Sequence, residues 1–444
     1  MPPRHRPSAL DRRTFVKLSA AGMASLLAGP FRRLPGQTTQ APAGLTPVYW
    51  VNEIPDDPYA FPDHPNYHGG LEALLALLGW SGLKIYNTPS ETLLGGPQGL
   101  IGPEDIVLIK VNAQWKHRGA TNTDLVRGLI QRVLDYPDGF RGEVIIFENG
   151  QGRGSLACDN TANYDDASVQ ANANDNRQSF QYLVDAVFRD SRVSARLFDR
   201  LKRTFIAEDD HRQDGYRLWE NISYPCFTSA GGRRVELKEG VWNGAAFEPK
   251  LKLINVPVLK HHDRGGSEIT ASLKHVYGIL SMADSEDNAN ERHYQNLGSV
   301  CGKMFVSVRP PVLNILDCIW VSHNSITGYP ASTTFRANQL LASQDPVALD
   351  VCGAKHVLYP IDNNERHHPD FSGINAWLVQ AREMINGRGG LRSAEPLIAV
   401  DKVTRDEADI DLIRDSAARY IQEGPLPAEK TEPEPKVKKR SRPF

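Results

Sequence analysis

Three lysines carry the clearest chemistry that this sequence offers. Lys110 interrupts an apolar run from Ile106 to Val111, and a buried lysine is costly unless it is paired or bound to an anion. Lys260 and Lys274 lie on either side of the pair Gly265-Gly266, where the chain turns. The alternative for each lysine is a strand-end ion pair with Glu148 or Asp317. The predicted substrate-binding residues are Lys110, Asn112 and Lys260, and the predicted catalytic residues are His261, Asp317 and Lys274.

Histidines and carboxylates of the same segments are candidate metal ligands. Glu148, His262 and His323 offer the imidazole and carboxylate groups that bind zinc, iron or manganese. No His-Glu-x-x-His motif occurs, and the alternative is a set of hydrogen-bonded loop histidines. The cofactor is therefore unknown, and a divalent metal remains open. The five cysteines form no Cys-x-x-Cys pair, which argues against an iron–sulfur cluster, but they allow two disulfides in an oxidising compartment.

The segment from Pro249 to Leu280 is the one around which these residues are arranged. Its apolar run Leu251–Val256 predicts a buried strand, and Pro257 closes that run. Ser267 is the predicted N-cap of a following helix, whose apolar positions recur at helical spacing. A helix N-terminus with free N–H groups attracts anions, so we expect an anion-binding site at this helix start.

A strand, a helix and a second strand precede this segment. Residues 106–111 and 144–147 are apolar strands, and Thr121 or Asn122 is the predicted cap of the helix between them. This order predicts an α/β fold with a mostly parallel sheet flanked by helices. Ligands of such sheets bind at the carboxyl ends of the strands, so the six predicted site residues should meet at one cleft.

The chain is predicted to contain an α/β domain over residues 44–423 and a disordered, Pro/Glu/Lys-rich tail over 424–444. Residues 151–249 form a large predicted insertion with helices at 180–188 and 193–205 and a hairpin at 235–242. Such an excursion is typical of a lid or a small second lobe. Residues 405–421 are a further predicted helix.

Residues 1–43 differ in composition from the rest of the chain. Asp11-Arg12-Arg13-Thr14-Phe15 precedes a short apolar run and resembles a twin-arginine export signal, with Ala41-Pro42-Ala43 as a small-residue cleavage site. The alternative is a basic leader. The resemblance implies the twin-arginine export machinery as a partner and a periplasmic or otherwise exported protein. We expect no membrane span in the mature chain, and the net charge of -2 gives no reason to expect nucleic acid.

Several short motifs occur together over residues 105–358, the core that resembles the family called domain of unknown function 362. The resemblance implies an α/β fold but no settled reaction. Many members are similar to iron–sulfur proteins with a ferredoxin-like cysteine segment, which this chain lacks. The matching motifs are Ile109-Lys110-Val111-Asn112, Asn255-Val256-Pro257, Leu259-Lys260-His261, Ser272-Leu273-Lys274, Asn314-Ile315-Leu316-Asp317 and Asp345-Pro346-Val347-Ala348-Leu349-Asp350.

From these observations we expect an exported enzyme that acts on a small anionic substrate through a cleft of lysine, histidine and aspartate, with or without a metal. The alternative is a non-catalytic periplasmic binding or maturation protein that uses the same cationic pocket. An acid–base group poised near neutral pH would favour the enzyme. A cationic pocket without such a group would favour the binding protein.

Overall fold

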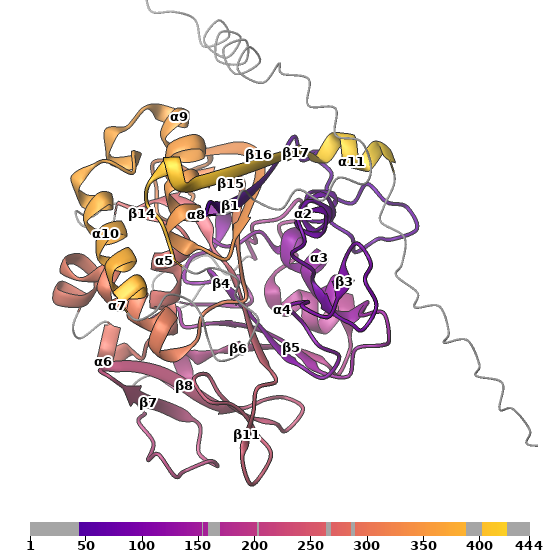
Figure 1. Ribbon diagram of the computed structural model, residues 1–444, viewed down its shortest axis with the longest axis vertical. Coiled ribbons are helices and arrows are strands. Elements are labelled where there is room, and N and C mark those ends of the chain that lie inside the picture. The colour runs from indigo at the N-terminus through magenta and orange to yellow at the C-terminus, as the bar shows by residue number, and fades with distance from the viewer. Residues whose placement is uncertain are drawn as a thin grey trace, which may run out of the picture. The chain divides into compact units, whose positions relative to one another are not determined.

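The centre of the fold is a sheet of mostly parallel strands (Figure 1). The computed structural model describes residues 44–152, 154–158, 169–201, 204–262, 268–285, 289–387 and 402–423. On the main path of the sheet, β16 is antiparallel to both neighbours, and the other neighbouring pairs are parallel. The predicted α/β class is therefore confirmed. The order is β17 (Ile410–Ser416), β1 (Thr46–Asn52), β16 (Thr334–Ser343), β15 (Leu313–Ser322), β12 (Leu251–Val256), β4 (Ile106–Val111), β5 (Glu143–Glu148) and β6 (Val193–Leu197).

Helices cover both faces of this sheet, because successive strand residues point to opposite sides. Val107 and Ile109 of β4 pack with α2 (Gly69–Trp80) and α3 (Thr123–Leu134). Ile106 and Leu108 belong to the opposite core, with α7 (Leu297–Lys303), α8 (Pro346–Cys352) and α10 (Ser372–Gly387). Figure 1 shows α2 and α3 on one side of the strands and α7 and α10 on the other. The same alternation places Lys110 on the face of Ile106 and Leu108.

Two helix starts have side-chain caps, and one of them is Asn122, a predicted cap. The Asn122 side chain accepts a hydrogen bond from Leu125 N at 3.1 Å at the start of α3. Asp345 Oδ1 accepts from Val347 N at 2.8 Å and Ala348 N at 2.9 Å at the start of α8. These caps satisfy N–H groups that have no partner within the helix, so the two helix positions are fixed locally.

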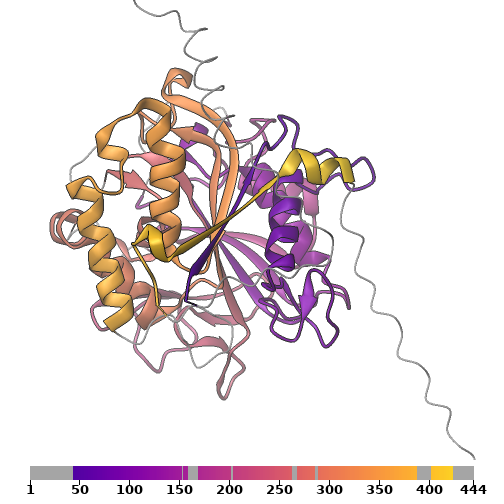
Figure 2. The ribbon, with the colours of Figure 1, turned by 45° about the horizontal axis from the view of Figure 1, so that its top comes forward.

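Two predicted helices are strands at least in part. Residues 193–197 form β6, which pairs with β5 at the edge of the main sheet, although the apolar spacing there suggested a helix. Residues 410–416 form β17, which pairs with β1, and the helix α11 begins only at Ala417. Figure 2 shows the yellow β17 lying beside the indigo β1. Pairing with a distant strand overrides local spacing in both places.

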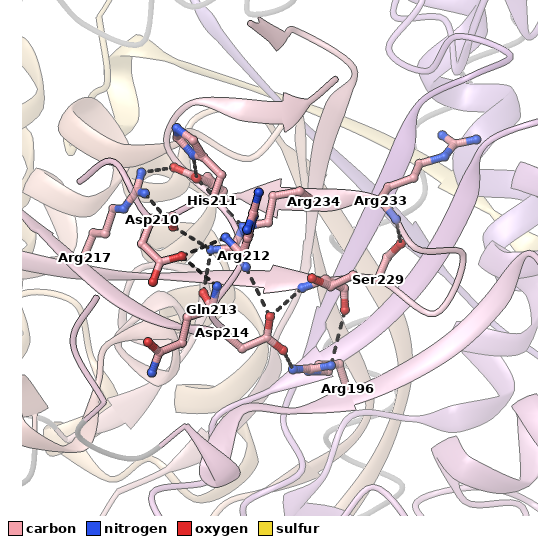
Figure 3. A network of polar contacts seen from close by, with 12 residues as sticks. Arg196, Asp210, His211, Arg212, Gln213, Asp214, Arg217, Ser229, Arg233 and Arg234 are labelled. Atoms are coloured by element: carbon pink, nitrogen blue, oxygen red, sulfur yellow. Dashed lines mark hydrogen bonds and ion pairs between the residues drawn. The ribbon is translucent and has the colours of Figure 1, made fainter. Parts of the chain in front are cut away.

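A second, antiparallel sheet follows β6 within the region predicted as an insertion. Its polar network joins it to the main sheet (Figure 3). Asp214 accepts hydrogen bonds from Thr228 N at 2.8 Å and from Arg234 at 3.2 Å, and it also pairs with Arg196 of β6. The predicted hairpin at 235–242 is confirmed as β9 and β10. The order is β11 (Phe247–Glu248), β10 (Gly240–Trp242), β9 (Arg234–Glu236), β8 (Ile222–Thr228) and β7 (Gly215–Trp219).

The structure contains no disulfide among the cysteines. All five cysteines are buried free thiols, so neither of the disulfides that the sequence allowed is present. Within the described ranges, no helix has the length and apolar character that crossing a membrane requires.

Candidate functional site

A cavity of about 550 Å³ lies at the carboxyl ends of β4 and β5 and beside β13 (Val258–His261). This volume is within the range of small-molecule sites. Four of the six predicted site residues line it, and so do two of the three candidate metal ligands. The four are Lys110, Asn112, Lys260 and Lys274, and the two are Glu148 and His262.

Lys110 and Glu148 form a buried ion pair in the wall of the cavity. Lys110 Nζ lies 2.9 Å from Glu148 Oε1, 2.9 Å from the Val111 carbonyl oxygen and 3.2 Å from His275 Nε2. Glu148 Oε2 accepts from Ala113 N at 3.0 Å. Three acceptors use all three hydrogens of an ammonium, and both Glu148 oxygens accept, so the geometry is that of the charged forms. Lys110 is thus saturated and has no hydrogen left for a substrate.

Burial acts against the charges of this pair. It lowers the pKa of Lys110, while the Glu148 carboxylate pulls that pKa upward. It also raises the pKa of Glu148 to about 7, against the opposing effect of the Lys110 ammonium. Protonation of Glu148 would therefore end the ionic contact and leave the Lys110 ammonium without its counter-charge.

His275 links this pair to the centre of the sheet. Its Nδ1 lies 2.6 Å from Asn255 Oδ1, while Asn255 Nδ2 donates to Asn314 Oδ1 at 2.9 Å. Since the Asn255 oxygen must accept, His275 Nδ1 carries the hydrogen and Nε2 accepts from Lys110. Burial, reinforced by the Lys110 charge, holds the pKa of His275 well below its usual range. His275 is consequently a neutral partner that orients Lys110.

Lys260 differs from Lys110 in its partners. It is 3% exposed, and its Nζ donates to the Gly119 carbonyl oxygen at 2.6 Å. No carboxylate of the described residues forms an ion pair with it. Burial lowers the pKa of Lys260 to about 7; the Glu148 charge opposes that shift and the Lys110 charge adds to it. A buried lysine with so low a pKa in a cavity is a candidate functional group.

The side chains around Lys260 make the cavity suited to an anion. Glu148 is the one carboxylate among the described lining residues, and Lys110 neutralises it. Lys274 adds a further cation to the wall. The Asn112 side-chain oxygen accepts from Val258 N at 3.1 Å, and its amide nitrogen has no partner among the described residues. That nitrogen can donate to a ligand.

Two of the predicted catalytic residues do not line the cavity. Lys260 and His262 point to one side of their strand, so His261 points to the other, where its Nδ1 lies 2.9 Å from His367 Nε2. Asp317 lies within β15 rather than at its end, and it accepts from Asn122 N at 2.7 Å. The prediction that six residues share one cleft is wrong for His261 and Asp317. The side chain of His261 points away from that of Lys260, and β15 continues beyond Asp317.

The predicted anion site at a helix start is also corrected. The helix α5 (Ser272–His275) begins after a short strand, and residues 263–267, which include the predicted cap Ser267, lie outside the described part. Its first N–H groups, from Ser272 and Leu273, donate to Asp350 at 2.7 and 2.9 Å. A carboxylate of the chain itself occupies the position that we had expected a ligand to fill.

A second cluster of backbone N–H groups also donates to a carboxylate of the chain itself. After β5, the N–H groups of Gly150, Gly152 and Gly154 donate to the Asp199 carboxylate at 2.5, 2.7 and 3.2 Å. Backbone N–H groups that point to one place in this way attract anions. Because Asp199 occupies these N–H groups, they are not available to a ligand. The groups that face a ligand are the lining side chains of the cavity.

The candidate metal ligands are only partly brought together. Glu148 and His262 line the cavity, whereas His323 lies 3.3 Å from Asp362, away from it. Burial, together with neighbouring cations, lowers the pKa of His262, so its imidazole is neutral. In the part of the chain that the structure describes, no group of three or more histidine, cysteine and acidic side chains is arranged to hold a metal ion.

Several lining residues were not predicted. Gln114 and Trp115 follow β4 directly, so the rule that ligands bind at strand carboxyl ends could have identified them. His293 and Tyr294 come from the π-helix Asn290–Gln295. The His293 ring lies 5.5 Å from that of His262. No local pattern distinguishes these two residues from ordinary loop residues.

Comparison with known proteins agrees with five of the six sequence motifs, because the motif at residues 109–112 lies outside the matched range. Residues 239–355 match the family model described as domain of unknown function (DUF362). This range includes β12, β13, α5, β15, β16 and the whole of α8, and therefore two of the three cavity lysines. No curated protein and no solved structure matches the chain. Residues 239–355 are thus similar to the DUF362 family of domains of unknown function.

Proposed function

We propose that the cavity is the site of an enzyme that acts on a small anionic substrate. In this proposal Lys260 is the acid–base group, and Lys274 and Asn112 bind the anionic part of the substrate. The observation that carries the proposal is Lys260 itself: a buried lysine that lines the cavity, with one backbone acceptor and a pKa of about 7.

The chemistry of Lys260 follows from that pKa. A general acid or base works best when its pKa lies near the operating pH. Below pH 7 the Lys260 ammonium attracts an anion, and above pH 7 its neutral amine can accept a proton. A substrate that carries both an acidic group and an exchangeable proton would use both forms. A protein that only binds anions has no use for an amine kept in this state, which is why we favour the enzyme.

We also propose, from the sequence alone, that the chain is exported. The residues that resemble a twin-arginine signal, Arg12 and Arg13, lie outside the described part of the chain. In this proposal the twin-arginine machinery is the partner and the periplasm is the compartment. Since that machinery carries folded proteins, the cavity would be complete before export.

Titration calorimetry tests the proposed site. The ligands are lactate, succinate, phosphate and sulfate, measured at pH 6 and pH 9 with the wild type and with Lys260→Met. We expect at least one of them to bind more tightly at pH 6. Loss of the charge-assisted hydrogen bond in Lys260→Met should weaken that binding at pH 6 by about 10- to 150-fold, the equivalent of about 1.5–3 kcal/mol.

Lys252→Met is the matched control. Lys252 is 7% exposed, lies on β12 and does not line the cavity. Its replacement removes a buried lysine without touching the site and should leave anion binding unchanged. Equal weakening by both substitutions would contradict the proposal. Tight binding with the same dissociation constant at both pH values would favour the non-catalytic binding protein.

A further inference from the structure

We infer that Lys260 is a nucleophile that condenses with the carbonyl group of a small 2-oxo carboxylate to form an imine. This inference rests on the proposed function of the cavity and adds the substrate class and the covalent step.

The positions of the two lysines assign the nucleophile. A lysine attacks a carbonyl only as the neutral amine, and burial or a neighbouring cation keeps it neutral. Lys260 is 3% exposed and no carboxylate of the described residues forms an ion pair with it, so burial favours its neutral amine. Lys110 cannot take this role, because Glu148, Val111 and His275 use all of its hydrogens. Of these two lysines, Lys260 is thus the one without a carboxylate partner among the described residues.

The other residues that line the cavity indicate the class of substrate. An amine forms an imine only with an aldehyde or a ketone, so a carboxylate or phosphate alone offers no carbon to attack. Lys274 and the amide nitrogen of Asn112 line the same cavity and suit a carboxylate beside that carbonyl. A cavity of about 550 Å³ suits a small molecule. A 2-oxo carboxylate carries both groups on adjacent carbons.

The covalent step balances without a redox partner. The Lys260 nitrogen forms a bond to the carbonyl carbon, and the carbon–oxygen double bond breaks. The oxygen leaves as water and takes both hydrogens of the amine. The product is an imine between Nζ and the former carbonyl carbon. The carboxylate stays attached and is held by the cationic wall.

Trapping with borohydride tests the inference. The full-length protein is incubated with pyruvate or glyoxylate and sodium borohydride, and its intact mass is measured. The expected result is one adduct, with a mass equal to the oxo acid less one oxygen atom. Peptide mapping should place that adduct on Lys260. This mapping uses the wild type, so it does not depend on whether a variant folds.

Two variants and one ligand complete the test. Lys260→Arg keeps the charge but cannot form an imine, and it should lower the adduct yield more than tenfold. Lys252→Arg, outside the cavity, should leave the yield unchanged. Lactate has the carboxylate but no ketone, so its binding reports on the cavity alone. If lactate binds and no adduct forms on Lys260, the inference is wrong and the proposed function stands. If no oxo acid binds, and lactate, succinate, phosphate and sulfate do not bind either, both are wrong.

Discussion

Replacing Lys260 by methionine should make the fold more stable at low pH. In the unfolded chain this lysine has its ordinary pKa of 10.5, and burial lowers the pKa to about 7 in the folded protein. Each unit of this pKa difference corresponds to about 1.4 kcal/mol. At pH 6, where the amine is charged in both states, burial of the charge therefore lowers the wild-type free energy of unfolding by about 5 kcal/mol. Methionine fills a similar volume and carries no charge, so it removes this cost.

The substitution also has a cost of its own, because the Gly119 carbonyl oxygen loses the donor at 2.6 Å. An unsatisfied buried acceptor costs about 1–3 kcal/mol. The net gain for Lys260→Met at pH 6 is therefore about 2–4 kcal/mol.

The gain should shrink as the pH rises. Between pH 7 and pH 10.5 the unfolded chain binds one proton more than the folded protein at this lysine, so wild-type stability rises with pH. At pH 9 the remaining charge penalty is about 2 kcal/mol, which the lost hydrogen bond offsets. The difference between the variant and the wild type should fall by about 3 kcal/mol from pH 6 to pH 9.

Urea unfolding of both proteins at four pH values between 6 and 9 measures this difference directly. The change in this stability difference with pH does not depend on the cost assigned to the lost hydrogen bond, because that cost is the same at every pH. A variant that is less stable than the wild type by the same amount at every pH would refute the reasoning, because Lys260 would then titrate alike in both states.

Three further predictions concern other parts of the chain. Glu148→Gln leaves the Lys110 ammonium buried without its counter-charge, so the free energy of unfolding should fall by about 3–5 kcal/mol; a loss below 1 kcal/mol in urea unfolding would mean that the ion pair is not formed. Asp350→Asn keeps one acceptor at the start of α5 and loses the other, which should cost about 1.5–3 kcal/mol; an unchanged melting temperature would exclude this carboxylate as the cap. Arg12→Lys combined with Arg13→Lys should leave the protein in the cytoplasm, as measured by fractionation, and an undiminished periplasmic yield would rule out the twin-arginine route.

The sequence predicts the parts of the fold that rest on local patterns. The mostly apolar runs of β4, β5 and β12 identify buried parallel strands. Thr121 and Asn122 mark the start of α3, where Asn122 is the cap. By contrast, β6 and β17 are strands because of partners that are far away in the chain, and their own residues do not indicate this.

The site divides in a similar way. Lys110, Asn112 and Lys260 were predicted because they follow or interrupt apolar strands, and the sheet brings them to one cavity. His261 was misplaced because β13 continues through it, which turns its side chain away from Lys260. The helix start at Ser272 is filled by Asp350, a residue 78 positions further along the chain. No local rule anticipates such a contact.

The titration of Lys260 itself tests the central claim most directly. The protein is labelled with ¹³C at the lysine ε-carbons, and Lys260→Met identifies the Lys260 resonance. We predict a midpoint near pH 7 that moves upward when lactate binds, because an anion stabilises the ammonium form. A midpoint near the ordinary value of 10.5, unchanged by lactate, would contradict the account.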